Sequence, residues 1–226
     1  RRELYAQHAS DTVFFGGPEI FTGVPRLDPE EGDEIITLER AWEWQHRTWV
    51  HQDLIAALLE ANNGDNARTG PVKRVVEISV DPWPIAPSSV QAAQPQSGLS
   101  TPIALDYTEA HTGLRGWQGR PNPLYDLRNA TVRMIVDGDR IHEVVDAIGK
   151  TNLMFVTDMD IREYDGDIDL RRGYDYGGGQ TAALTLRVQT AWLRSWIKTD
   201  MPASVRTMLG IPEDPAPLDD QTADAS

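Results

Sequence analysis

The chain has no cysteine among its 226 residues. This absence excludes a disulfide framework, a thiolate zinc site and a cysteine nucleophile, and it leaves the redox compartment open. Long apolar runs are missing too: the longest, LIAALL at 54–59, is far shorter than the roughly 20 residues that cross a bilayer. No membrane span is predicted in this sequence. Because the chain begins RRELYAQHAS, without a signal-peptide pattern, any membrane anchor is expected upstream of it.

Basic side chains are outnumbered, with 21 Lys and Arg against 35 Asp and Glu and a formal net charge of −14. Nucleic acid and anionic lipid both require a basic surface that neutralises phosphates, so neither is predicted as a partner. A basic ligand or partner remains open. The hydrophobic content of 40% is enough for one sizeable core or two small ones, and we expect one core with long loops.

One long helix and four strands stand out. Residues 38–62 lack Gly and Pro and end at NNGDN, which predicts a helix. Its apolar face is broad enough to cover a sheet and comprises Trp42, Trp49, Val50, Leu54, Ile55 and Leu58. Alternating apolar and polar residues predict strands at 74–80, 130–136, 153–164 and 182–193, the last two forming a hairpin. Their expected inward residues are Val76, Ile78, Val80, Val132, Met134, Val136, Phe155, Met159, Ile161, Leu184, Leu186, Val188 and Trp192.

Three other segments are predicted to be less regular. Residues 1–37 mix Gly, Pro and acidic residues and are expected to form an irregular lead-in. Residues 82–123 are rich in Pro, Gln and Ser, which predicts a flexible insertion whose part 85–100 is mobile. The acidic end, 199–226, is predicted to be a disordered tail.

The segment VDGDRIHEVVDAIG, 136–149, gathers acids and a histidine as a metal site would. At about 100° per residue, its apolar residues form one helical stripe and the polar ones point the opposite way, toward water. Those polar residues are His142, Glu143 and Asp146. We therefore predict a helix over 139–149 that begins at an Asp139 N-cap and ends at Gly149.

Other candidate sites are equally weak. The acidic run at 158–169 lacks the spacing of a calcium loop, and His46 and His51 lie about 140° apart on their helix. The glycines at 177–179 are not followed by a helix start, and Ser195 has no base at a recognisable spacing. The sequence therefore predicts no catalytic residue, no cofactor and no metal site.

The order of elements is helix, strand, insertion, strand, helix, strand, strand. We expect both helices to cover one face of a four-stranded antiparallel sheet, over residues 38–198. This is an α+β fold, a ferredoxin-like two-layer sandwich in αββαββ order.

Interface candidates come from one helix and one strand. Trp44 lies off the face shared by Trp42 and Trp49, so it is expected either to be exposed or to contact a partner. Packing of Trp44 under the lead-in, near Phe14, Phe15 or Phe21, is the competing interpretation. The strand 182–193 offers unpaired backbone groups if it lies at a sheet edge. The strand candidates are Thr185, Arg187 and Gln189.

The run DGDRIHEVVDAIGKTNLMFVTDMDI and the final strand AALTLRVQTAWL resemble the periplasmic domains of PilO-type proteins of type IV pilus assembly and GspM-type proteins of type II secretion. The resemblance covers about 38–198, while the 82–123 insertion and the Trp-rich helix depart from it. The hydrophobic positions that match are Val136, Ile141, Val145, Ile148, Leu153, Val156, Met159 and Ile161.

The resemblance implies a non-enzymatic structural scaffold of an assembly platform, which acts by protein–protein pairing. It also implies a periplasmic domain of a single-pass inner-membrane protein, with the membrane contacted only through an anchor upstream of this chain. The partner would be a second copy, giving a homodimer, or a protein of like fold. The alternative is a small-ligand-sensing ferredoxin-like regulatory domain, with its pocket at a dimer interface. An enzyme ranks third.

Overall fold

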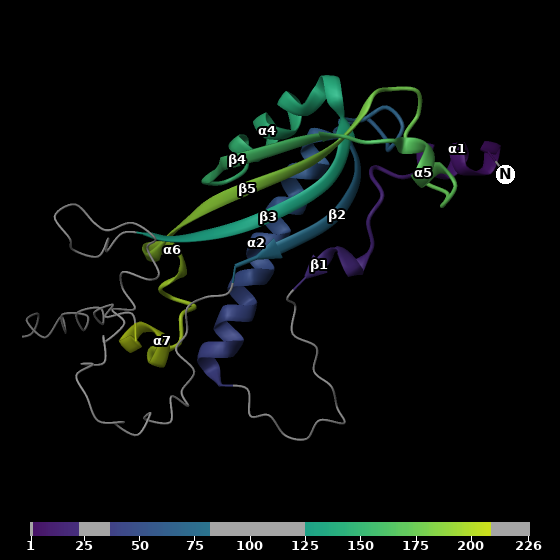
Figure 1. The fold of residues 1–226 in the computed structure, drawn as a ribbon. Coiled ribbons are helices and arrows are strands. Elements are labelled where there is room, and N and C mark those ends of the chain that lie inside the picture. Colours follow the sequence, from purple (N-terminus) through teal and green to yellow (C-terminus); the bar gives the residue numbers. More distant parts are fainter. Residues whose placement is uncertain (1, 23–36, 82–124, 209–226) are drawn as a thin grey trace, which may run out of the picture.

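The computed structural model describes residues 2–22, 37–81 and 125–208. Its centre is one open sheet with the strand order β1-β2-β3-β5-β4. The strands are β1 (Phe21–Thr22), β2 (Val72–Val80), β3 (Tyr125–Asp137), β4 (Met154–Glu163) and β5 (Thr181–Leu193). Figure 1 shows β3 and β5 as the two long central strands, with β4 and β1 at opposite sides.

The α+β class is confirmed, but the sheet has five strands and not four. The additional strand, β1, pairs with β2 in parallel, with Phe21 opposite Ile78. A wholly antiparallel sheet is therefore wrong. The three other pairings, β2 with β3, β3 with β5 and β5 with β4, are antiparallel, and the predicted hairpin of the last two strands is confirmed.

Two helices, α2 (Leu38–Ala61) and α4 (Ile141–Lys150), pack on the same face of the sheet, as predicted. The Thr37 hydroxyl accepts a hydrogen bond from the Arg40 backbone N–H and caps α2. The main core lies between this helical layer and the strands. It includes Val50, Leu54, Leu58, Val132, Met134, Val136, Val144, Ile148, Leu184, Leu186 and Val188. The opposite face of the sheet carries mostly polar side chains.

Two shifts of register change which strand residues face the core. In β2 the register shifts after Val75, so Val75 is buried and Val76, expected to face inward, is 42% exposed. In β4 it shifts just before Asp158, so Phe155 and Met159 lie on opposite faces. A bulge adds one residue to a strand and thereby inverts every later side chain, which simple alternation does not anticipate.

The start and end of α4 also differ from the prediction. The N-cap position of α4 is Arg140, which makes no side-chain cap hydrogen bond, so Asp139 does not cap this helix. The Asp137 carboxylate accepts a hydrogen bond from the Asp139 backbone N–H at 3.1 Å and caps the 3-10 turn before it. A 3-10 turn, Gly138–Arg140, precedes α4. Gly149 lies inside the helix, and the left-handed conformation falls on Asn152, at φ 48°.

The irregular lead-in expected over residues 1–37 is wrong for its described part, which contains α1 (Arg2–Ser10), a 3-10 turn at Pro18–Ile20 and β1. Three further short helices are α5 (Gly166–Leu170), α6 (Arg194–Ile197) and α7 (Ala203–Met208). Because α7 falls in 199–226, that segment is not wholly a disordered tail. The predicted insertion at 82–123 and the end of the chain from 209 lie outside the described residues.

Candidate functional site

None of the helices in the described ranges is long and apolar enough to cross a membrane. The same ranges hold no group of three or more His, Asp or Glu residues placed to bind a metal ion. His46 and His51, five residues apart on α2, contact different rings: His46 lies 4.6 Å from Trp192 and His51 lies 4.9 Å from Phe21, between ring centroids.

The strand chosen as an interface candidate is not an edge. β5 is paired with β3 on one side and with β4 on the other, so the reason for choosing it is wrong. Its three candidate side chains lie on the polar face of the sheet. The Gln189 amide donates to Asn129 Oδ1 at 3.0 Å, Arg187 lies 3.7 Å from the Asp81 carboxylate, and Thr185 is half-buried. Contact of this face with a partner stays a prediction.

Trp44 is half-buried on α2, and the Arg40 guanidinium lies 5.6 Å from the centroid of its ring. Of the lead-in rings proposed to cover it, Phe15 packs on Tyr174 at 5.1 Å and Phe21 packs on His51. Nothing in these contacts tests whether Trp44 meets a partner, which stays a prediction.

The sheet edge opposite β1 is formed by β4, and it is the most exposed strand. Only Met154 of its ten residues is buried. Phe155, Met159 and Ile161 are 56%, 47% and 48% exposed, although alternation predicts them to face inward. Within the described residues, β4 pairs with β5 alone, so its outer edge is available for another strand.

A buried carboxylate, Asp169, lies in α5 and accepts hydrogen bonds from Tyr164 at 2.7 Å, Tyr176 at 2.5 Å and Arg74 at 3.1 Å. Burial raises the pKa of this carboxyl, but the two tyrosine hydrogen bonds and the Arg74 charge outweigh it and hold the pKa below its usual range. Burial and the hydrogen bond to Asp169 raise the pKa of Tyr164 to about 12. Because its donors come from β2 and from the segments that flank α5, the Asp169 carboxylate links α5 to the sheet and stabilises the fold.

A second buried polar cluster joins α2, β3 and α6. Arg194 donates to Asp126 Oδ1 at 2.7 Å, and both side chains are buried. Arg128 Nε lies 3.4 Å from His46 Nδ1, and burial lowers the pKa of Arg128 to about 10. Sequence reasoning missed this cluster, since the strand pattern treated β3 as starting only at residue 130.

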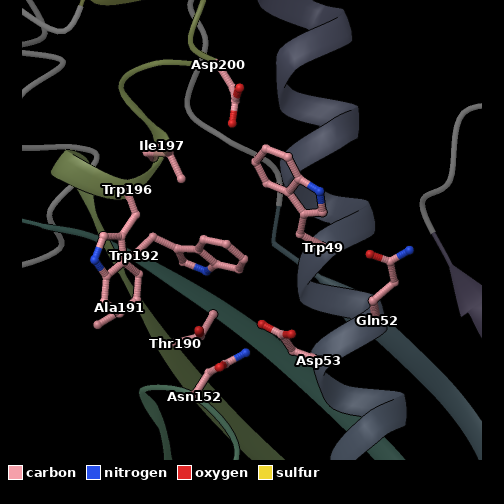
Figure 2. Close-up of a pocket in the computed structure, with 10 residues that line it drawn as sticks. All are labelled: Trp49, Gln52, Asp53, Asn152, Thr190, Ala191, Trp192, Trp196, Ile197 and Asp200. Atoms are coloured by element: carbon pink, nitrogen blue, oxygen red, sulfur yellow. The ribbon is translucent and has the colours of Figure 1, made fainter.

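Beside this cluster is an open cavity of about 330 Å³ between the middle of α2 and the end of β5 with α6. We call it the tryptophan cavity. It is lined by Trp49, Gln52, Asp53, Asn152, Thr190, Ala191, Trp192, Trp196, Ile197 and Asp200. Figure 2 shows the Asp53 carboxylate and the Asn152 amide pointing toward each other on one side of the Trp49 and Trp192 rings, with Asp200 on the other side.

Two of the rings in this cavity stack on each other, and its Asp53 carboxylate is half-buried. Trp49 and Trp192 are stacked, with centroids 5.9 Å apart and planes 21° apart, while Trp196 is 61% exposed. Burial raises the pKa of Asp53, and the hydrogen bond with Asn152 opposes that shift. The sequence assigned Trp49 and Trp192 to inward faces, and its interface candidate, Trp44, does not line the cavity. That Asp53, Asn152 and Asp200 line the same cavity had no sequence signal.

No protein-family model matches the sequence, and no curated protein matches it. Weak likeness is found to two solved structures. One is the type 4 fimbrial biogenesis protein PilO from Pseudomonas aeruginosa, with a TM-score of 0.24 and 8% identity over 32% of this chain and 47% of that chain. The chain thus spans about half the length of that structure. The other is a core domain from Akkermansia muciniphila, with a TM-score of 0.43 and 9% identity over 85% of this chain and 82% of that one.

Proposed function

We propose that this chain is a non-enzymatic scaffold that works by pairing with another protein through the outer edge of β4. The observation that carries the proposal is the exposure of Phe155, Met159 and Ile161 on the last strand of an open sheet. Apolar side chains beside unpaired backbone groups favour strand addition, in which main-chain hydrogen bonds give affinity and side-chain contacts give specificity.

The partner in this proposal is a second copy or a protein of like fold. The four antiparallel strands, ordered β2-β3-β5-β4 with α2 and α4 on one face, support a ferredoxin-like unit. Two such units related by a two-fold axis present the same β4 edge to each other, so the contact is self-complementary and closes as a dimer.

The setting we propose is the inner-membrane platform of type IV pilus assembly or type II secretion. Its support is the PilO-type and GspM-type hydrophobic pattern over 38–198, from Val136 to Ile161 and along β5. In that setting the chain is a periplasmic domain of a membrane-anchored protein.

Sedimentation across micromolar to near-millimolar concentration tests the β4 pairing. The double variant Met159→Lys, Ile161→Lys places two charges on the edge and is expected to shift the wild-type dimer to monomer. Val76→Lys is the matched control, because Val76 is similarly exposed but lies on β2, whose edge is occupied by β1. Val76→Lys is expected to leave the dimer intact.

Other outcomes of this experiment separate the alternatives. Loss of association in Trp44→Ala, but not in the β4 variant, moves the interface to α2 and contradicts the edge proposal. A wild type that is monomeric throughout, and that binds no co-encoded protein of like fold, removes the scaffold proposal.

A second candidate, the small-ligand-sensing domain, is favoured by the tryptophan cavity alone. Its volume of about 330 Å³ is at the low end of the range of small-molecule sites. A ligand that binds the wild type without changing its association state would favour this candidate.

A further inference from the structure

The tryptophan cavity combines aromatic walls with acidic groups. Of the described residues that line it, Asp53 and Asp200 carry charge, and none is lysine, arginine or histidine. The local charge is therefore negative within a chain whose net charge is already −14. Such a cavity repels anions and attracts cations before any contact is made.

The Asp53 carboxylate lacks a cationic partner in the cavity. Its hydrogen-bond partner among the described residues is the Asn152 amide. Half-burial raises the pKa of Asp53, which means that holding the negative charge there is unfavourable. A cation placed beside the carboxylate would offset this cost.

The tryptophan rings provide the second half of a cation site. Indole faces attract cations more strongly than other aromatic rings do. His46 packs on Trp192 with centroids 4.6 Å apart, and Trp49 stacks on Trp192, so both neighbours hold that ring in place. Trp196 also lines the cavity and is 61% exposed, so its ring is accessible to a bound group.

The apolar lining decides between kinds of cation. A hard metal ion requires several converging oxygen ligands, but the two carboxylates of the cavity, Asp53 and Asp200, lie on opposite sides of the rings, and the described residues hold no group of three or more acids or histidines that could bind a metal. Ala191, Ile197 and the three indoles add apolar surface. An ammonium group that carries methyl groups is weakly hydrated, and it can contact ring faces and aliphatic side chains at the same time. We propose that the tryptophan cavity binds a compact organic cation with an alkylated ammonium head, held between Asp53 and the indole rings.

This inference does not depend on pairing through β4, because the lining residues come from α2, β5, α6, the segment after α6 and, for Asn152, the turn before β4, and none belongs to β4 itself. The test uses choline and its uncharged isostere 3,3-dimethyl-1-butanol, with intrinsic tryptophan fluorescence and NMR shifts of the indole N–H groups as readouts. Choline is expected to bind with a millimolar dissociation constant, and the isostere at least about tenfold more weakly. Added salt is expected to weaken choline binding.

Variants locate the site. Asp53→Asn keeps the size of the side chain and removes its charge, and Trp196→Ala removes an exposed ring with little effect on the core; each is expected to weaken choline binding about tenfold. Asp146→Asn, an exposed acid on α4, is the matched control and should bind as the wild type does. Thermal unfolding of every variant establishes that it is folded.

Three results overturn the proposal: no choline binding by the wild type, equal binding of choline and its neutral isostere, or unchanged binding in Asp53→Asn. The second result would leave an apolar cleft without cation selectivity. Sedimentation of the same samples keeps the outcome separate from that of the β4 pairing.

Discussion

The two edges of the sheet differ in whether another described segment of the chain pairs with them. At the β2 edge, the Phe15 backbone N–H donates to the Lys73 carbonyl at 3.0 Å, and the Val75 backbone N–H donates to the Phe15 carbonyl at 2.8 Å. Farther along the same edge, β1 pairs with β2. At the β4 edge, no described segment pairs with the outer side. Phe15 is 4% exposed, whereas Phe155 is 56% exposed. An aromatic residue on a strand is thus core or surface according to what the rest of the chain places over its edge.

Side-chain hydrogen bonds from distant segments hold the covered edge in place. Asn62, at the end of α2, bonds the backbone of Val13 in the lead-in and of Val72 in β2. Asp169 binds Arg74 of β2, and the Arg74 guanidinium lies 4.3 Å from the Tyr174 ring centroid. The β4 edge has only exposed ion pairs such as Arg162 with Asp160, which contribute little. Perturbing the two edges should therefore have very different effects.

The largest effect is expected from Asp169→Ala. It leaves Arg74, Tyr164 and Tyr176 without their buried acceptor, and breaking such a pair typically costs about 3–5 kcal/mol of unfolding free energy. Urea denaturation measures it. Asp167→Ala, an exposed acid in the same helix, is the control and should cost well under 1 kcal/mol. A similar small loss in Asp169→Ala would show that this group does not hold the covered edge.

Asn62→Ala is expected to cost about 2–3 kcal/mol, because the buried backbone N–H and carbonyl of Val72 and the part-buried carbonyl of Val13 lose their partner. Hydrogen exchange should also show faster opening at Val72, whose N–H donates to Asn62 Oδ1 at 2.8 Å. The neighbouring exposed Asn63→Ala should change neither quantity. Equal effects of the two substitutions would contradict the assigned role.

The covered edge should also weaken in acid through His51, which packs on Phe21 of β1. Burial, followed by the charge of Arg47, lowers the pKa of His51 to about 4. Since the pKa of His51 is lower in the folded than in the unfolded protein, the contribution of the neutral side chain to stability is complete above the unfolded pKa. It is lost as the pH falls toward the folded pKa, and the unfolding free energy should fall by about 2 kcal/mol between pH 7 and pH 5.

Stability curves of the wild type and His51→Phe across this range isolate the histidine, because other titrating groups contribute to both proteins. As the pH falls from 7 to 5, the wild type should lose more unfolding free energy than His51→Phe does. His142→Asn, at an exposed position on α4, should follow the wild type. Parallel curves for wild type and His51→Phe would remove His51 as the cause.

The smallest effect on stability is expected at the open edge. Met159→Lys with Ile161→Lys should change the unfolding free energy of the dilute monomer by about 1 kcal/mol or less, because both residues are about half exposed, at 47% and 48%. Thermal or chemical unfolding at low protein concentration measures this. A loss of several kcal/mol would mean that these residues are covered within the monomer.

Local patterns predicted much of the fold. Helix α2 and the four longer strands were predicted within a few residues, except that β3 starts earlier, at Tyr125. Inward positions such as Val132, Leu184 and Leu186 were predicted correctly. The errors lie where one residue interrupts the period, as at the bulge before Asp158, or where a cap shifts, as at Asp137.

The candidate sites could be predicted much less well. Trp49 and Trp192 were predicted to face inward, but nothing in the sequence predicted a cavity between them, and Asp53 and Asp200 lie on segments far apart in the chain. Thr185, Arg187 and Gln189 were chosen on the condition that their strand was an edge, and that condition is a property of the whole sheet. Neither the shared cavity of Asp53 and Asp200 nor the inner position of β5 in the sheet can be predicted from residues that are neighbours in the sequence.

The sequence by itself determined the main elements and the buried faces of α2, β3 and β5, since helix and strand periods, glycine and proline stops, and side-chain polarity act over a few residues. It also determined the acidic character that favours cationic ligands over nucleic acid. Only the tertiary structure decided that β1 and Phe15 cover one edge while no described segment pairs with the outer side of β4, and that Asp53 lines one cavity with Trp49, Trp192 and Trp196. These outcomes depend on contacts between distant segments, whose geometry is set by packing of the whole core and not by local preference.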